Sequence, residues 1–204
     1  MIPDSGARVP GAEGRSPVAG GARNETGRRI LHVASGLLGP LAAALGSRVA
    51  TPAFAGLVAV ASGAEFARLR WPRARTWLGR FAGVWFRPAE ASAVSGAAIL
   101  ALGYALAWWL FPAAAAERAI LVTAVADPMA ATVGTRFGGG RRKSWAGSAA
   151  CAATAALVLL LTGLPIAIAA VGAAVATVVE RAPWRGADNL LLPVGVAAAL
   201  GWMA

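Results

Sequence analysis

Carboxylate side chains placed beside long apolar stretches are the residues of this sequence best suited to metal and phosphate chemistry. Beyond the first 27 residues the acids are Glu65, Glu90, Glu117, Asp127, Glu180 and Asp188, each at or near the end of an apolar segment. Carboxylate oxygens bind Mg²⁺, and guanidinium groups and backbone amides bind phosphate oxygens. Because a charge near hydrocarbon is costly, this placement predicts a Mg²⁺ and polyphosphate site. Pairing of the same acids with arginines at a membrane surface is the alternative.

The stretch from Asp127 to Ser148 gives the most specific pattern. An acid near the end of an apolar helix is followed by a glycine-rich turn, a basic cluster and small residues that begin the next helix. Glycine lets backbone N–H groups approach a phosphate closely, and a helix N-terminus favours an anion. The residues expected around the phosphates are Gly134, Arg136, Gly138, Arg142, Lys143, Ser144, Gly147 and Ser148. A flexible basic loop with Ser148 as a helix N-cap is the plainer interpretation, but it leaves Asp127 unexplained.

The composition indicates that membrane helices position these residues. Hydrophobic residues make up 58% of the 204 positions and charged residues 14%, which is too apolar for a soluble domain of this size. The net charge of +10 does not indicate nucleic acid as a partner, because the arginines lie in loops between apolar stretches. Lipid headgroups and anionic substrates explain them better. The single cysteine, Cys151, excludes disulfides within the chain and a multi-cysteine metal site.

Seven apolar segments are expected to form an all-α, polytopic membrane helix bundle with six to seven transmembrane helices. They run over about residues 30–45, 49–66, 94–111, 119–133, 148–161, 165–179 and 190–203, and Pro40 interrupts the first. Residues 77–86 are too short to span and are expected at the membrane interface. Residues 1–27 have few large apolar side chains and are predicted to form a disordered basic tail. Residues 28–204 then form the transmembrane catalytic domain.

The distribution of basic residues predicts the orientation. If the helices alternate in direction, the N-terminal tail and the loops after the second, fourth and sixth segments share one side of the membrane. All of the 19 basic residues except Arg48 and Arg118 fall on that side, which the positive-inside rule assigns to the cytoplasm. We therefore expect an integral protein of the inner (cytoplasmic) membrane, with its active face cytoplasmic and its C-terminus outside. Small residues on the helices would also permit a homodimer.

Several motifs together resemble a known family. The pattern D-x-x-A-x-x-x-G-x-x-x-G from Asp127, followed by K-S-x-x-G-S from Lys143, resembles the signature of the CTP-dependent lipid kinases. This family comprises dolichol kinase, phytol kinase and yeast-type diacylglycerol kinase, and is distantly similar to phosphatidate cytidylyltransferase. Further matches in the family's order are Arg28-Arg29 with His32, Glu65 with Arg68, Arg87-Pro88 with Glu90, Ser95-Gly96, Glu180 with Pro183, and Asp188-Asn189 with Pro193. Ala146 stands where many relatives carry glutamate.

The resemblance implies transfer of the γ-phosphate of CTP to the hydroxyl of a membrane lipid alcohol, such as polyprenol or dolichol, diacylglycerol or phytol. It implies Asp127, Lys143 and Asp188 as catalytic residues, Mg²⁺ held by Asp127, Glu180 and Glu90, and further nucleotide contacts from Arg29, His32 and Asn189. The base would be Asp127, Glu180 or Asp188, and His32 is also able to take a proton.

Other interpretations stay open at this stage. In nucleotidyl transfer, a lipid phosphate would attack the α-phosphate of CTP and release pyrophosphate at the same kind of site. A non-catalytic membrane scaffold or a transporter is the rival from another class. Among single residues, Asp188 and Asn189 would also serve as helix N-caps, and His32 would also serve as a plain hydrogen-bonding residue at the interface.

Overall fold

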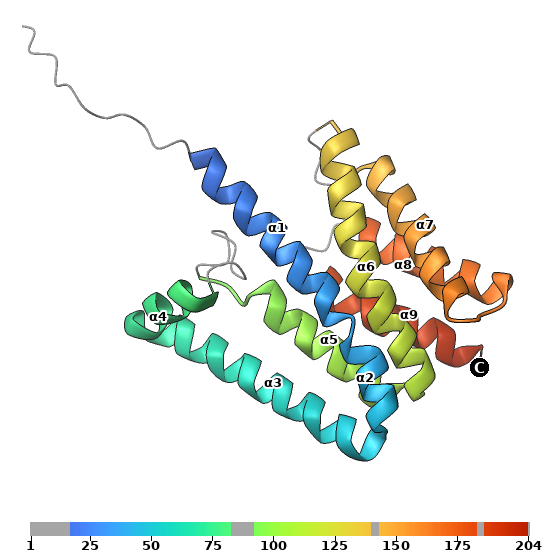
Figure 1. Ribbon diagram of the computed structural model, residues 1–204, viewed down its shortest axis with the longest axis horizontal. Coiled ribbons are helices and arrows are strands. Elements are labelled where there is room, and N and C mark those ends of the chain that lie inside the picture. Colours follow the sequence, from blue (N-terminus) through green and yellow to red (C-terminus); the bar gives the residue numbers. More distant parts are fainter. Residues whose placement is uncertain (1–16, 83–91, 140–142, 183–185, 204) are drawn as a thin grey trace, which may run out of the picture.

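The computed structural model describes residues 17–82, 92–139, 143–182 and 186–203, and within these ranges every regular element is an α-helix (Figure 1). The helices are α1 Pro17–Ser35, α2 Leu38–Leu45, α3 Ser47–Arg70, α4 Pro72–Ala82, α5 Gly96–Leu110, α6 Ala113–Phe137, α7 Trp145–Leu161, α8 Ile166–Arg181 and α9 Asp188–Trp202. The prediction of an all-α fold is confirmed.

The seven apolar segments all coincide with helices, but the first one is divided between α1 and α2. The break falls at Gly36 and Leu37 and not at Pro40, which lies in the first turn of α2. A proline is tolerated there because the first N–H groups of a helix have no partner within it. A Cβ atom on Gly36 would lie 2.7 Å from the Cβ of Ala124, so the glycine lets the chain pass close to α6.

The predicted starts of α1, α6 and α7 were wrong, and α6 begins at Ala113 rather than near residue 119. Helix α1 begins at Pro17, inside the stretch predicted as a disordered tail, and one of its turns carries Glu25 with Arg28 and Arg29 at helical spacing. Such pairs three and four residues apart favour a helix. Helix α7 begins at Trp145 and not at Ser148, because the hydroxyl of Ser144 accepts the backbone N–H of Gly147 at 3.1 Å.

The segment predicted at the membrane interface forms the short helix α4, and its residues 83–86 lie outside the described ranges. Trp71 is extended and separates α3 from α4, as expected for a residue that precedes a proline. Pro72 then occupies the first position of α4, where its fixed φ suits a helix start.

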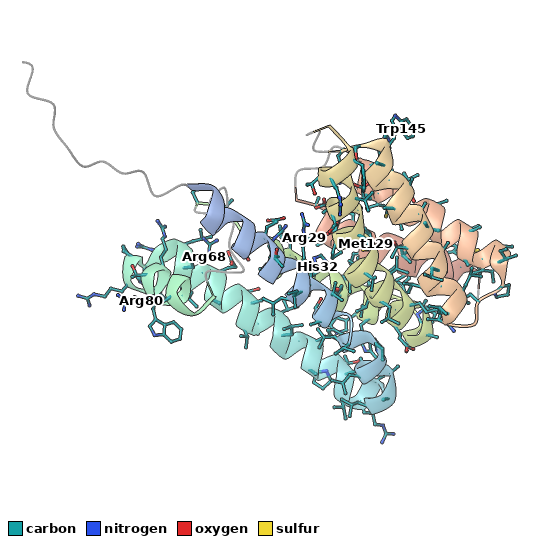
Figure 2. The ribbon with its side chains drawn as sticks, turned by 45° about the horizontal axis from the view of Figure 1, so that its top comes forward. Arg29, His32, Arg68, Arg80, Met129 and Trp145 are labelled. Atoms are coloured by element: carbon teal, nitrogen blue, oxygen red, sulfur yellow. The ribbon has the colours of Figure 1, made fainter. Side chains whose placement is uncertain are left out.

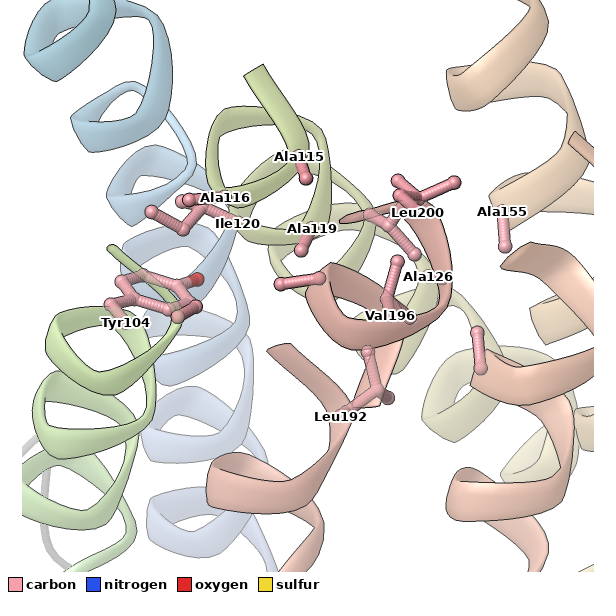
Figure 3. Close-up of a cluster of buried hydrophobic side chains, with 14 of the residues drawn as sticks. Tyr104, Ala115, Ala116, Ala119, Ile120, Ala126, Ala155, Leu192, Val196 and Leu200 are labelled. Atoms are coloured by element: carbon pink, nitrogen blue, oxygen red, sulfur yellow. The ribbon is translucent and has the colours of Figure 1, made fainter. Parts of the chain in front are cut away.

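Helix α6 is the centre of the bundle and contacts α1, α2, α5, α7, α8 and α9. Its buried face is mostly alanine, and Ala116, Ala119 and Ala126 are fully buried within the bundle (Figure 3). Small side chains let helix backbones approach closely, while Tyr104, Ile120 and Leu192 fill the remaining space. This central helix carries Asp127, so the packing fixes that carboxylate relative to these six helices.

By length and composition, α3 is long and apolar enough to cross a membrane, and among the described helices it alone meets that test. The apolar helices α5, α7 and α9 are shorter. Large apolar side chains face outward on several helices, with Val60 73%, Leu161 78%, Ile166 76% and Val178 70% exposed.

Candidate functional site

A cavity lined largely by charged and polar residues lies between α1, α6, the start of α7, the end of α8 and the start of α9. We call this cavity, which has a volume of about 320 Å³, the polar cavity. The predicted site residues that line it are Arg29, His32, Asp127, Gly134, Lys143, Ser144, Gly147, Glu180, Asp188 and Asn189. Side chains separated by more than 150 positions in the sequence therefore meet in one place, and Figure 2 shows Arg29 and His32 on the side of α1 that faces α6.

Other predicted site residues are not brought to this cavity. The guanidinium of Arg136 lies 5.5 Å from the ring centroid of Phe137, and both side chains are exposed. Gly138 packs against Ser144, and Ser148 lies behind Glu180. The predictions for Arg136, Gly138 and Ser148 as nucleotide contacts therefore have no support in this arrangement. Glu90 and Arg142 lie outside the described residues.

Lys143 joins the two acids that come from α8 and α9. Its Nζ lies 3.2 Å from Oε1 of Glu180 and 3.5 Å from Oδ2 of Asp188, and it also donates to the backbone carbonyl of Glu180. That carbonyl belongs to the last turn of α8, where a cation is favoured. Lys143, which lies two residues before α7, is therefore held against the end of α8 and the start of α9, and it lines the polar cavity.

Glu180 is also held from behind, on the side away from the cavity. Its side chain is 8% exposed, and its Oε2 accepts the hydroxyl of Ser148 at 3.1 Å. Arg181 donates to the same hydroxyl at 3.3 Å, and its guanidinium lies 3.6 Å from the ring centroid of Trp145. Ser148 is thus a positioning residue for Glu180 rather than a helix N-cap.

Asp127 has a partner that the sequence did not indicate. Nδ1 of His32 lies 3.7 Å from Oδ2 of Asp127, so α1 supplies the neighbour of this acid. Arg29 donates to the hydroxyl of Thr132 at 3.1 Å, which ties the same face of α1 to α6. Pairing of Asp127 with Arg118 or Arg136 is not found. The Arg118 side chain instead donates to the carbonyl of Ala114.

The glycines of the motif have a packing role that the sequence did not distinguish from phosphate binding. A Cβ atom on Gly147 would lie 2.9 Å from the carbonyl oxygen of Ala130, and one on Gly134 would lie 3.2 Å from Oγ of Ser144. A Cβ atom on Gly138 would lie 2.6 Å from the Cβ of Ser144. Close contact between α6 and the start of α7 therefore requires these glycines, with or without an anion.

Asp188 and Asn189 are not N-cap residues of α9, in contrast to the alternative interpretation of the sequence. Ala187 occupies the N-cap position, and Asp188 and Asn189 are the first two residues of the helix. Nδ2 of Asn189 donates to the carbonyl of Gly96 at 2.9 Å and so joins α9 to the start of α5. Oδ1 of Asp188 accepts the backbone N–H of Asn189 at 3.2 Å, and its Oδ2 lies 3.5 Å from Nζ of Lys143 at the polar cavity.

A second cavity of about 230 Å³, which we call the apolar cavity, adjoins the polar one. The two share Arg28, His32 and Asn189 as lining residues. The rest of the apolar cavity is mostly aliphatic, with one polar pair in which Ser35 and Tyr104 place their hydroxyl oxygens 3.1 Å apart.

Sequence reasoning missed the apolar cavity, although one signal for it was present. Arg28, Leu31, His32, Ser35 and Leu38 recur at steps of three and four residues, which is the spacing of one helix face, and all five line the cavity. Glu25, which lines the polar cavity and pairs with Arg28 at 2.5 Å, was missed because it fell in the predicted tail.

The acids fit a magnesium ion that is shared with phosphates rather than one enclosed by the protein. Among the residues that the structure describes, no group of three or more histidine, cysteine, aspartate or glutamate side chains is arranged to hold a metal. Mg²⁺ commonly uses one or two carboxylates together with substrate phosphates and water. Asp127, Asp188 and Glu180 line one cavity beside several cations, which is compatible with that mode.

Comparison with known proteins adds no assignment, since no protein-family model, curated protein or solved structure matches this chain. The similarity to the CTP-dependent lipid kinases therefore rests on the motif residues alone.

Proposed function

We propose that this protein is a CTP-dependent kinase that phosphorylates the hydroxyl of a membrane lipid alcohol. The observation that carries the proposal is the adjacency of the two cavities. One contains carboxylates and cations suited to a metal-bound triphosphate, the other is apolar, and they meet at His32 and Asn189. A phosphate donor and an amphiphilic acceptor thus have neighbouring sites.

The proposal includes a polytopic membrane bundle. Support comes from the outward-facing valine, leucine and isoleucine side chains of α3, α7 and α8 and from the one-sided distribution of basic residues. Helices α5 and α9 have 15 residues each and α7 has 17, fewer than the roughly 20 of an ideal span. Local thinning of the bilayer and anchoring by flanking residues accommodate such lengths. The polar cavity then opens toward the cytoplasm.

In the proposed reaction, the oxygen of the lipid hydroxyl forms a bond to the γ-phosphorus of CTP. The bond from that phosphorus to the bridging β–γ oxygen breaks, and its electron pair leaves with CDP. His32 lines both cavities and accepts the hydroxyl proton, while Asp127 at 3.7 Å stabilises the resulting imidazolium. The products are a lipid monophosphate and CDP.

Charge neutralisation supplies the rest of the proposed catalysis. Arg28, Arg29 and Lys143 bring positive charge to the polar cavity, where it opposes the charge of the triphosphate. Mg²⁺, when bound with the nucleotide by Asp127 and Asp188, would withdraw electron density from the transferred phosphate. Lys143 also keeps Glu180 and Asp188 in place, so it positions acids as well as binding phosphate.

The decisive experiment follows the γ-phosphate. Purified protein in lipid nanodiscs is incubated with Mg²⁺, a mixture of polyprenol, diacylglycerol and phytol, and CTP labelled at the γ-position. Label in a lipid monophosphate supports the kinase, and omission of each alcohol in turn identifies the acceptor. Label in pyrophosphate, with cytidine in the lipid, would replace the kinase with a nucleotidyltransferase.

A negative result also has a defined meaning. The choice of CTP rests on the family resemblance, so labelled ATP is tested beside it. Absence of lipid labelling from both donors, in a preparation that unfolds cooperatively, would contradict catalysis and favour a scaffold or a transporter. The Asp127→Asn variant serves as the inactive reference for any label that is found.

A further inference from the structure

The apolar cavity extends along one face of α1 and deep into the bundle. Its walls come from Leu31 and Leu38 on the α1–α2 side, from Leu57 of α3, and from the segment between Gly96 and Tyr104 of α5. That segment rises by about 12 Å at 1.5 Å per residue. This depth is close to the hydrocarbon thickness of one leaflet, about 15 Å.

The two ends of the apolar cavity differ in chemistry. Near the polar cavity it is lined by Arg28, His32 and Asn189. At the other end of the α5 wall lies Tyr104, which is 1% exposed and whose hydroxyl is satisfied by Ser35 at 3.1 Å. Among the residues that the structure describes, no carboxylate lines the cavity. The lining thus suits a neutral molecule with one polar end and a hydrocarbon chain.

Helices α1 and α3 both line this cavity but do not pack against each other. Helix α1 packs on α6, whereas α3 packs on α2, α4 and α5. In Figure 1, α1 and α3 diverge from their connection at α2, with α5 visible between them. Leu57 is the residue of α3 that lines the cavity, so it stands at the boundary between α1 and α3.

We infer that the apolar cavity binds the hydrocarbon chain of the acceptor, and that the chain enters sideways from the inner leaflet between α1 and α3. The hydroxyl then lies at His32 and Asn189, and the first part of the chain runs toward Tyr104 in the middle of the bilayer. The identity of the occupant as an alcohol rests on the proposed function. The position of its chain rests on the two adjoining cavities, which share Arg28, His32 and Asn189 as lining residues.

Binding is tested separately from turnover with a photoreactive probe. A long-chain alcohol with a diazirine on its chain is incorporated into nanodiscs with the full-length protein and irradiated, and labelled peptides are identified by mass spectrometry. We expect labels on the peptides that contain Leu31, Leu57 and Ala97, and competition by unlabelled alcohol. Labels confined to the outward faces of α7 and α8 would overturn the inference.

Substitution of a bulky residue at the boundary between α1 and α3 tests the inference, and a substitution elsewhere on α3 is the matched control. Leu57→Trp should reduce probe labelling and raise the KM for the lipid alcohol by about tenfold or more, with an unchanged KM for CTP. Val60→Trp, on the same helix but 73% exposed and outside the cavity, is the control and should change neither quantity. If Leu57→Trp does not fold, Ala97→Leu introduces a smaller obstruction in the opposite wall.

The outcomes separate the two proposals. Specific labelling of the cavity without any phosphotransfer supports this inference and contradicts the kinase. Phosphotransfer that is equally fast in Leu57→Trp, Ala97→Leu and Val60→Trp supports the kinase and overturns the inference.

Discussion

His32 Nδ1 lies 3.7 Å from Asp127 Oδ2, and this contact joins α1 to the central helix α6 at a residue that lines both cavities. The only histidine of the sequence thus faces the acid with which the most specific motif begins. In the proposed reaction, this pair takes the proton of the lipid alcohol and faces the metal-bound phosphate.

Replacement of Asp127 by asparagine should abolish most of the proposed activity. The amide keeps the size of the side chain but cannot stabilise an imidazolium or bind Mg²⁺, so we expect kcat to fall by about 10²–10⁴. The measurement is CTP-dependent lipid phosphorylation in nanodiscs. Glu117→Gln is the control, since Glu117 lies on the same helix outside both cavities. Equal activity of the two variants would remove Asp127 from the mechanism.

Replacement of Lys143 by methionine should affect both stability and activity. Glu180, whose side chain is 8% exposed, would lose its cationic partner, and we expect the free energy of unfolding to fall by about 1–3 kcal/mol. Activity should fall about 100-fold or more, because in the proposed reaction Lys143 both positions Glu180 and Asp188 and neutralises charge on the phosphates. Lys143→Arg should recover stability better than activity. Chemical unfolding and lipid phosphorylation are compared with Arg48→Gln, an exposed arginine outside the polar cavity.

The convergence of the charged residues was predictable from the sequence, whereas their exact partners were not. Asp127, Lys143, Glu180 and Asp188 line one cavity as the motif suggested, although Asp127 lies in the interior of α6 and not near its end. The other three residues lie just before α7, in the last turn of α8 and at the start of α9, and all three of these helices contact α6. The contact of Asp127 with His32 depends on the packing of α1 on α6. No local pattern specifies that packing.

Two features of the site show where sequence reasoning has a physical limit. Glycine has no Cβ atom, which allows both a close approach of the backbone to a phosphate and close packing of two helices. The sequence alone therefore did not reveal that Gly134 and Gly147 bring α6 and α7 together. The Ser35–Tyr104 pair joins residues 69 positions apart, and it exists only because α1 and α5 enclose the same cavity. Helical periodicity places residues on a face but does not identify the opposite wall.

Gly147→Ala should destabilise the contact between α6 and α7. The added Cβ atom would lie 2.9 Å from the backbone oxygen of Ala130, so one helix must shift, and we expect a loss of about 1–3 kcal/mol. Gly56→Ala is the matched control because nothing lies within 4 Å of its Cβ position on α3. That change should be neutral or stabilising by up to about 1 kcal/mol. Both values come from chemical unfolding, and an equal effect of the two substitutions would contradict the packing role.

Metal binding should depend on the nucleotide. Because the described residues contain no enclosed group of ligands, the protein alone should bind Mg²⁺ weakly, and CTP should increase the affinity. Titration calorimetry with Mg²⁺, in the presence and absence of CTP, measures this coupling. Asp188→Asn should reduce the coupling by about tenfold. Tight Mg²⁺ binding without nucleotide would instead indicate a site that includes residues beyond those described.

The buried pair of Glu65 and Arg68 should hold the start of α5 in place. Nη2 of Arg68 donates to Glu65 at 2.6 Å and to the carbonyl of Ala93 at 2.6 Å, while the N–H of Ser95 donates to the same carboxylate at 3.1 Å. Arg68→Met leaves a carboxylate that is 7% exposed without this cation, and we expect a cost of about 3–5 kcal/mol.

The double variant tests whether the two charges act together. Glu65→Leu with Arg68→Met removes both charges, so its loss of unfolding free energy should be clearly smaller than the sum of the single losses. Arg70→Met, on the exposed side of the same helix, should change stability by less than about 0.5 kcal/mol.

Because Gly96 follows Ser95 and lines the apolar cavity, Arg68→Met should also raise the KM for the lipid alcohol more than that for CTP. Additive losses in the cycle would show that Glu65 and Arg68 stabilise the helices independently.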